Sequence, residues 1–359
     1  MLDKRSAITI AGALALLTSM VACGTANTAP TSENGLTSIT IGSMESNSLS
    51  FPYTIAQEQG FFQGAGLQVE TVTATSGPQL TSALIGNTTQ IAIGTPENVM
   101  GAMNQGQHIT AIPPFGHIDM SLVTPADSGI ADVKSLRGKQ IGVVQRGSAS
   151  ERFARTVLSS SGVDPDSVTY VAVGSGATME PAVRNKKVDA TVGSTSTVVT
   201  MEDHGIEFRT LASPFDGTAG ELGDVGLQTF WTTTEEFAQQ NPEVLDKFCT
   251  AMNKAADWIA DDTNRGSGTQ SLATLLQIPT ESAGRIWDKT HLSWSPTINE
   301  ATWAANVDWI LGDGSSGIPF EVRHGWFVPP CPRRDEPHGR TIGGDPGAAR
   351  RPVGLCTWQ

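Results

Sequence analysis

Cysteine is scarce in this sequence of 359 residues, and the four that occur form neither a CxxC pair nor a zinc-binding pattern with the histidines. Charged residues make up only 16%, with 36 acidic against 23 basic side chains and a formal net charge of −13. No stripe of Lys and Arg interleaved with aromatic residues occurs before residue 321. We therefore expect no metal, no cofactor and no nucleic-acid partner.

Motifs of nucleophilic or metal-assisted catalysis are also missing. The patterns GxSxG, SxxK and HExxH do not occur. The glycine-containing stretch from Val173 to Thr178 lacks the third glycine of a dinucleotide fingerprint. The sequence thus predicts no catalytic residues and favours a protein that is not an enzyme.

The N-terminus has the pattern of an export signal. Lys4 and Arg5 precede an apolar run from Ala7 to Ala22 that is too short to span a bilayer comfortably. The sequence MVACG that follows resembles the bacterial lipoprotein box, in which the chain is cut before the cysteine and the thiol is acylated; an ordinary signal peptide with an incidental cysteine is the alternative. We expect residues 1–22 to be a lipoprotein signal peptide, Cys23 to be lipidated, and residues 23–37 to form a flexible tether to the membrane.

The C-terminal tail, residues 321–359, differs in composition from the rest of the chain. It contains six Arg, no Lys, six Pro and four acidic residues, and shows neither a helical nor a strand period. A disordered basic arm would explain this composition, as would out-of-frame translation of a GC-rich gene. We favour the second explanation.

Between these ends, strand patterns alternate with helical patterns. The strand patterns lie at 38–42, 67–72, 91–94, 109–112, 120–124, 140–144, 168–173, 190–192, 208–211 and 227–232. Helical patterns follow most of them, three beginning near Pro52, Pro78 and Pro96, and helices near 242–260, 271–276, 282–290 and 300–311 complete the chain. Strands that alternate with helices predict parallel sheets.

This order predicts an α/β protein with two lobes, each a mainly parallel sheet with flanking helices. Lobe 1 is expected to be discontinuous, from 38–125 and 227–320, and lobe 2 to span 126–226. The first crossing between lobes is expected at Pro125 to Gly129. Two connections between lobes would form a hinge.

Four segments in this order resemble a known family: ITIGSMESNSLSFPYTIAQEQGFFQGAGLQVE, TSGPQLTSALIGNTTQIAIGTPENV, SLRGKQIGVVQRGSASERFARTVLSSSGVDPDSV and AVRNKKVDATVG. They are similar to the solute-binding proteins of bacterial ABC importers, in the nitrate, sulfonate, taurine and pyrimidine-precursor group called SsuA/THI5-like or NMT1-like. The resemblance covers about residues 38–311. It implies a two-lobed type II fold of the periplasmic-binding-protein kind, which encloses a ligand by hinge bending.

The resemblance also implies partners and a location. The loaded, monomeric protein would dock on an ABC permease, and a lipid on Cys23 would keep it near that permease at the outer face of the cytoplasmic membrane. The implied ligand is a small anion such as a sulfonate, taurine or nitrate. A pyrimidine-precursor or aromatic-acid binding protein, a ligand sensor and a secreted enzyme are the alternatives; the pyrimidine synthases that share the fold are associated with a cysteine-rich motif that is absent here.

Candidate ligand contacts follow from strand ends, because ligands of open parallel sheets lie beyond the carboxyl ends of the strands. The expected contacts are Ser48, Leu49, Ser50, Thr75, Ser76, Gly77 and Thr95 in lobe 1, Arg146, Gly147, Ser148, Ala149, Gly193 and Ser194 in lobe 2, and Trp231 beside the hinge. Helix N-termini and hydroxyls suit an anionic group, and Arg146 could bind an acid with two hydrogen bonds. Helix capping by the serines and core packing of Trp231 are the alternatives. Glu45 could face a cationic or amide-bearing ligand, or be a solvated loop acid.

Overall fold

The computed structural model describes residues 35–44, 47–74 and 76–312. Several expectations concern residues outside these ranges. They are the signal peptide, lipidated Cys23, most of the tether, Glu45, Thr75 and the tail from residue 321. For these the sequence remains the only guide.

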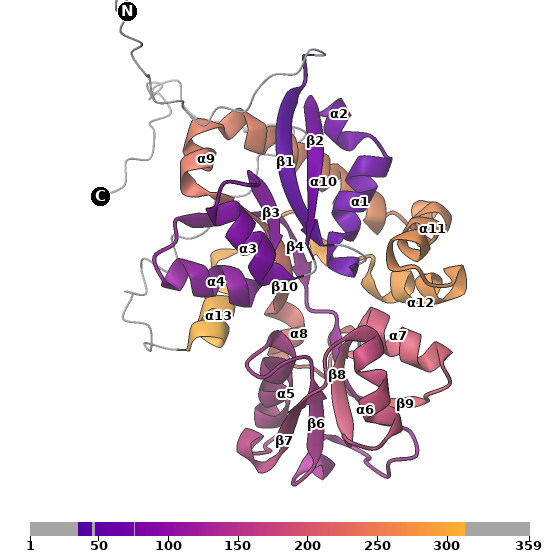
Figure 1. Cartoon of the computed structure of the whole chain (residues 1–359). Helices are drawn as coiled ribbons and strands as arrows, with labels where there is room; N and C mark the ends of the chain where they lie inside the picture. Colours follow the sequence, from indigo (N-terminus) through magenta and orange to yellow (C-terminus); the bar gives the residue numbers. More distant parts are fainter. Residues whose placement is uncertain (1–34, 45–46, 75, 313–359) are drawn as a thin grey trace, which may run out of the picture.

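Two mixed sheets, one in each lobe, organise the described part of the chain (Figure 1). The first has the order β11-β4-β10-β3-β1-β2 and contains β1 (Thr37–Met44), β2 (Leu67–Ala74), β3 (Ile91–Gly94), β4 (Ile109–His117), β10 (Leu227–Thr234) and β11 (Trp294–Ser295). The second has the order β7-β6-β8-β5-β9 and contains β5 (Met120–Pro125), β6 (Gln140–Val143), β7 (Thr169–Ala172), β8 (Ala190–Ser194) and β9 (Phe208–Ala212). In each sheet the strand that follows a crossing, β10 or β5, is antiparallel to both its neighbours.

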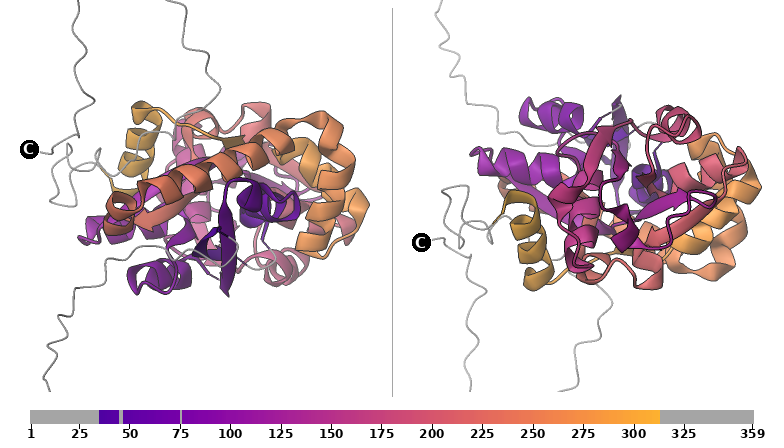
Figure 2. Two further views of the ribbon diagram at one scale, coloured as in Figure 1. Left: turned by 90° about the horizontal axis from the view of Figure 1, so that it is seen from above. Right: turned by 90° about the horizontal axis from the view of Figure 1, so that it is seen from below.

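Helices flank both sheets (Figure 2). Lobe 1 carries α1 (Phe51–Glu58), α2 (Phe61–Gly64), α3 (Gly77–Ile85), α4 (Pro96–Asn104), α9 (Glu235–Gln240), α10 (Pro242–Ala260), α11 (Arg265–Leu276), α12 (Thr280–Thr290) and α13 (Glu300–Leu311). Lobe 2 carries α5 (Ala149–Ser160), α6 (Glu180–Arg184), α7 (Thr195–Asp203) and α8 (Glu221–Val225). Proline occupies the first turn of α1, α3, α4 and α10, where its missing N–H costs no hydrogen bond.

The core of lobe 1 is built on the apolar face of α10. Val244, Phe248, Met252, Ala255 and Ile259 recur along this helix and are all buried. The Phe248 ring lies 6.1 Å from that of Phe62, and burying such a ring contributes about 2 kcal/mol. The neighbouring Cys249 is also buried.

The first crossing between lobes differs from expectation. The sequence analysis assigns the strand at 120–124 to lobe 1, with the crossing at Pro125 to Gly129, but β5 pairs with β8 and β9 inside the second sheet. The chain therefore crosses between the end of β4 and the start of β5, and returns at Gly226, just before β10. An apolar pattern specifies a strand but not its partners, so the error has a physical reason.

Side chains of α12 and α13 also join the lobes. Arg285 on α12 contacts Glu202 at 2.9 Å and also Asp203, both on α7. On α13, Trp309 Nε1 donates a hydrogen bond of 2.9 Å to Thr156 Oγ1, and the Ile310 carbonyl accepts one of 2.7 Å from Arg152. The lobes are thus bridged at two places besides the hinge.

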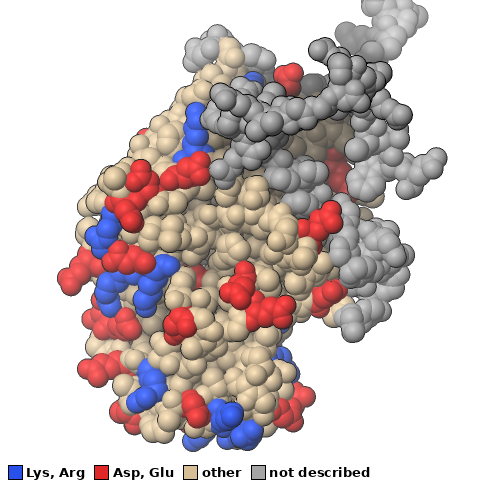
Figure 3. Space-filling view, turned by 180° about the vertical axis from the view of Figure 1, so that it is seen from behind, with Lys and Arg blue, Asp and Glu red and all other residues tan. Residues whose placement is uncertain are grey.

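Surface charge is mixed. On the face seen in Figure 3, Lys and Arg side chains lie among Asp and Glu side chains. In the described part of the chain, no helix has the length and apolar character needed to cross a membrane.

Candidate functional site

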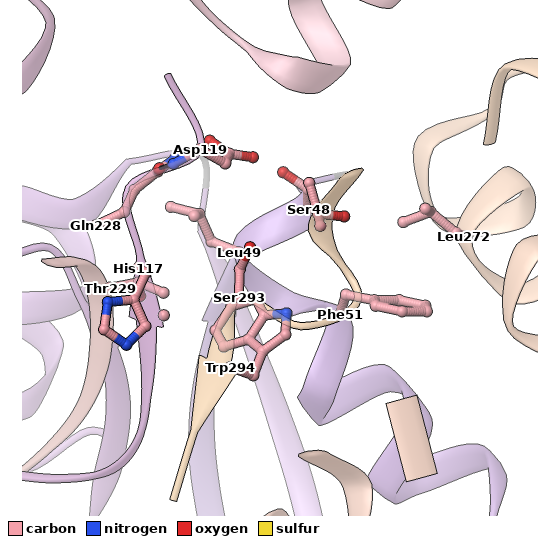
Figure 4. Close-up of a pocket in the computed structure, with 12 residues that line it drawn as sticks. Ser48, Leu49, Phe51, His117, Asp119, Gln228, Thr229, Leu272, Ser293 and Trp294 are labelled. Atoms are coloured by element: carbon pink, nitrogen blue, oxygen red, sulfur yellow. Dashed lines mark hydrogen bonds between the residues drawn. The ribbon is translucent and has the colours of Figure 1, made fainter. Parts of the chain in front are cut away.

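A recess lies at the hinge, where both crossings between lobes meet (Figure 4). Its lining comes from the turn before α1, from β4, β10 and β11, and from α11 and α12. The lining residues are Ser48, Leu49, Phe51, Gly116, His117, Asp119, Gln228, Thr229, Leu272, Thr290, Ser293 and Trp294. Its free volume is ≈ 20 Å³, room for roughly one water-sized group.

The backbone of Asp119 ties the two crossings to lobe 2. Its N–H donates a hydrogen bond of 2.6 Å to the side-chain oxygen of Gln228, which belongs to the return strand. Its carbonyl accepts from the backbone N–H of Thr195 at 3.0 Å and from the Thr195 hydroxyl at 2.9 Å. Because Thr195 begins α7, the peptide of Asp119 is held by groups that move with different lobes.

One oxygen of the Asp119 carboxyl lacks such a partner. The residue is only 7% exposed, and its Oδ1 has no hydrogen-bond partner within the described ranges. Burial raises the pKa of Asp119 to about 6, against smaller lowering effects of the Gln228 amide and the backbone N–H. In Figure 4 the side chain points toward Ser48 across the recess. Since buried polar atoms are normally hydrogen-bonded, this oxygen at the edge of the recess is a candidate position for an external partner.

The rest of the lining is aromatic, apolar or neutral. Trp294 packs so closely on Gly116 that an added Cβ would lie 2.6 Å from its ring and 2.7 Å from Thr229. Burial lowers the pKa of His117, which keeps this imidazole neutral at pH 7. No Lys or Arg occurs among the described residues that line the recess.

Two of the expected lobe 1 contacts, Ser48 and Leu49, line the recess. Ser50 lies next to them but is 1% exposed, and its hydroxyl is satisfied within lobe 1. It donates to the Met44 carbonyl at 2.9 Å and accepts from the Met44 N–H and from Ser43 Oγ. Ser50 therefore supports the strand end rather than the recess.

The strand ends after β2 and β3 converge, but Ser76, Gly77 and Thr95 are not among the residues that line the recess. A Cβ on Gly77 would lie 2.5 Å from Asn98 Nδ2 and 3.2 Å from Thr95 Oγ1, so these two loops touch. Ser76 and Thr95 occupy the N-cap positions of α3 and α4, and neither side chain accepts a capping hydrogen bond. The residues Ser76, Gly77 and Thr95 are thus brought together without reaching the hinge.

In lobe 2, a carboxylate of the protein itself fills the place expected for an anionic ligand. Glu151 is 5% exposed, and its Oε2 accepts 2.8 Å hydrogen bonds from both Arg146 Nε and the Gly147 N–H. Arg155 binds the other oxygen at 3.1 Å. Although burial opposes ionisation, the Gly147 N–H and the two guanidinium groups hold the pKa of Glu151 below its usual value.

The neighbours Ser148 and Ala149 begin α5 without facing the recess. The Ser148 hydroxyl donates to the Gln145 carbonyl at 2.6 Å, and Arg146 also approaches the Tyr170 ring at 5.5 Å. Of the expected group, Arg146 and Gly147 therefore bind Glu151, while the Ser148 hydroxyl bonds to Gln145 and Ser150. No member of this group is among the residues that line the recess.

The last three expected contacts, Gly193, Ser194 and Trp231, make helix-capping or packing contacts within the protein. Ser194 caps α7 by accepting a hydrogen bond of 3.3 Å from the Thr197 N–H, and Gly193 is buried in β8 beside Val198. Trp231 is 1% exposed and packs 5.5 Å from the rings of Tyr53 and Phe248 in the lobe 1 core. Trp231 therefore has no access to the recess.

The sequence analysis misses most of the recess, including Asp119, Gln228 and Trp294. A signal existed: Asp119 and Gln228 are polar residues that flank apolar strands where the chain changes lobe. Because the first crossing is expected some residues too late, Asp119 is not recognised as a hinge residue. Trp294 lies on a two-residue strand, which no periodic pattern reveals.

Two α/β lobes joined by two crossings, with a recess at the hinge, define a two-lobed protein of the periplasmic-binding-protein fold. Solved structures of the same fold support this class. The aliphatic sulphonate binding protein SsuA from Escherichia coli is 17% identical with a TM-score of 0.64, covering 75% of this chain and 89% of that one. The nitrate-binding protein NrtA from Synechocystis PCC 6803 is 13% identical with a TM-score of 0.62, covering 81% of this chain and 86% of that one.

The chain belongs to the NMT1/THI5-like family, whose model matches residues 47–265. A relative in sequence is the 4-amino-5-hydroxymethyl-2-methylpyrimidine phosphate synthase of Saccharomyces cerevisiae. The two are 25% identical over 223 residues, which is 59% of this chain and 63% of the yeast protein. The chain therefore spans less than two thirds of that relative.

Proposed function

We propose that this protein is the solute receptor of an ABC importer, which captures a small ligand between its lobes and delivers it to a membrane permease. The observation that carries the proposal is the unpartnered carboxyl of Asp119 at the hinge. A ligand that contacts this residue touches the point where both crossings and the start of α7 meet. Binding there can bias the equilibrium between open and closed lobes, as a receptor requires.

The proposed location is the outer face of the bacterial cytoplasmic membrane, with the protein anchored as a monomer through a lipid on Cys23. The lipoprotein box and the polar tether in the sequence support this anchor. In cells that express the protein, the Cys23→Ala variant should move from the membrane fraction to the soluble fraction. Equal membrane retention of the variant would contradict the anchor.

The ligand class requires a revision of the expectation from sequence. The helix N-terminus and Arg146, which favour an anion in the sequence analysis, are occupied by Glu151, and the recess presents an acid instead. No catalytic role is proposed for this lining. Binding and release of an unchanged solute is the function that this lining supports best.

A thermal-shift screen with recovery of the ligand tests the receptor function. Sulfonates, nitrate, aromatic carboxylates, pyrimidine precursors and primary amines would be added to the purified protein, and each stabilising compound would be recovered and weighed by mass spectrometry. A solute at 100 times its dissociation constant should add roughly 2.7 kcal/mol to the free energy of unfolding. A stabilising solute recovered unchanged supports a receptor. Recovery of a converted compound, or no stabilisation by any class, would contradict it.

A further inference from the structure

We propose that Asp119 is the ligand anchor of this receptor and that the solute presents a primary ammonium group to it. The inference rests on the proposed function and adds the chemical class of the ligand. It does not follow from the family, whose named structural relatives bind sulphonate and nitrate. It follows from the polar atoms of the recess.

Only Asp119 has a carboxyl group among the described residues of the lining, and its Oδ1 is both buried and without a partner. Several neighbouring polar groups are engaged. Gln228 accepts from the Asp119 N–H and its side chain also lowers the Asp119 pKa, while Thr229 Oγ1 and Thr290 Oγ1 donate to the carbonyls of Gly94 and Ile286, each at 2.9 Å. Ser48, His117 and Ser293 also line the recess, but within the described ranges none of them donates to Asp119 Oδ1, which leaves this oxygen open to a donor from a ligand.

The charge and size of the recess select an ammonium group. A buried carboxylate without a cation is unfavourable, and the described lining offers neither Lys nor Arg, while His117 is neutral. An ammonium group carries three N–H donors and no acceptor, and it is about as large as a water molecule. The free volume of ≈ 20 Å³ accommodates such a group. A sulfonate or nitrate is larger and would add a second negative charge.

The ionisation of Asp119 also favours an ammonium ligand. Burial raises the pKa of Asp119 to about 6, so the carboxyl is mostly ionised at pH 7 in spite of its surroundings. His117 is the other titratable side chain among the described residues of the recess, and its pKa is lowered. An incoming cation would therefore meet one negative charge and no positive one.

The remainder of the solute has apolar neighbours. Leu49, Phe51, Leu272 and Trp294 are among the residues that line the recess (Figure 4). The recess has no room for this part of a solute in the present conformation, so the lobes or Trp294 have to move to admit it. Entry of the ligand is thereby linked to hinge motion.

The test compares amines with analogues that lack the charge. Phenethylamine, β-alanine, putrescine and taurine would be titrated calorimetrically into the protein at pH 7.5, each beside the compound in which a hydroxyl replaces the amine. Nitrate and 3-phenylpropanoate would serve as anions without an amine. At least one amine should bind, and its hydroxyl analogue should bind ~30-fold or more weakly, as expected for loss of a buried charge pair.

Variants then locate the binding group. Asp119→Asn should lower the affinity for the amine by a similar factor. The control Asp257→Asn, which removes the same charge from the exposed side of α10, should leave the affinity within about twofold. Should Asp119→Asn fail to fold, Ser48→Ala tests the opposite wall of the recess and should lower the affinity for the amine several-fold.

Different results would contradict the receptor function and the ammonium ligand. Binding of nitrate or 3-phenylpropanoate with no binding of any amine would overturn the ammonium proposal and leave the receptor function standing. Amine binding that is unchanged in Asp119→Asn would overturn the role of Asp119 alone. Absence of binding by every compound, here and in the thermal-shift screen, would overturn both.

Discussion

Two buried carboxylates, Glu151 in lobe 2 and Asp119 at the hinge, have almost the same exposure and opposite surroundings. Glu151 accepts hydrogen bonds from the Gly147 N–H, Arg146 and Arg155, and its pKa is lowered. Asp119 has a buried oxygen without a partner in the described structure, and its pKa is raised to about 6. Burial alone therefore does not distinguish a structural acid from one that awaits a ligand; the hydrogen-bond partners do.

The comparison also explains why lobe 2 does not offer the expected anion site. A helix N-terminus followed by Arg146 has the charge for an anionic ligand. Glu151 lies one turn into the same helix and reaches back to both groups, as in a capping box. We therefore place the proposed ligand contact at the hinge, where Asp119 Oδ1 has no partner within the described residues.

The largest expected effect concerns Asp119 and pH. Its folded-state pKa of about 6 exceeds the usual value of 3.8, so its contribution to stability is fully present below pH 4 and is lost as the pH rises through about 6. The shift corresponds to ~3 kcal/mol at pH 7. The unfolding free energy of the Asp119→Asn variant, taken relative to that of the wild type, should therefore rise by this amount from pH 4 to pH 7. Urea unfolding of both proteins at pH 4 and pH 7 measures this difference. An equal change in the unfolding free energy of both proteins between the two pH values would show that Asp119 does not destabilise the folded state.

A smaller effect of opposite sign is expected for Glu151→Gln. The folded-state pKa of Glu151 is lowered, so its contribution is present above the unfolded pKa and is lost as the pH falls through the folded value. At pH 7 the variant should lose ~2 kcal/mol of unfolding free energy, less than for a fully buried pair because the arginines are partly exposed. Glu207→Gln, on an exposed side chain of the same lobe, is the matched control. Equal stability of the two variants would mean that the network around Glu151 contributes little.

The contact between α12 and α7 should affect conformation more than stability. Arg285→Ala removes the bridge to Glu202 and Asp203, which joins the lobes beside the hinge. We expect a larger radius of gyration by small-angle X-ray scattering and an affinity for solute reduced ~3-fold, since each exposed pair is worth under about 1 kcal/mol. Arg265→Ala removes a pair with Asp288 inside lobe 1 and should change neither quantity. A similar response of both variants would argue against a role of the bridge in closure.

The smallest effect is expected for Arg146→Ala. Because Arg146 serves Glu151 and the Tyr170 ring, its loss should change the affinity for the solute by less than about twofold. Isothermal titration of the variant with the solute found in the screen provides the measurement. A tenfold loss of affinity would restore the anion site predicted from the sequence.

Local signals in the sequence predict most of the fold. Prolines at helix starts and the apolar face of α10 specify elements whose ends agree with the structure within a few residues. The short elements α2, α8, α9 and β11 are missed, because a few residues provide too little period. The partners of β5 are also missed, since they depend on contacts with strands far along the chain.

The site is less predictable than the fold for a similar reason. The strand-end rule selects Ser48 and Leu49, which line the recess a few residues after the end of β1. It also selects Arg146 and Trp231, whose surroundings are decided by Glu151 and by the lobe 1 core. Whether a polar side chain is satisfied by the protein or left for a ligand depends on three-dimensional contacts that no local pattern contains.

A crystal structure of the protein with the solute that stabilises it most would test the central claim directly. The account predicts a solute nitrogen within hydrogen-bond distance of Asp119 Oδ1, with the rest of the solute against Trp294 and Leu49. A solute bound at the start of α5, with Glu151 displaced and Asp119 untouched, would contradict it.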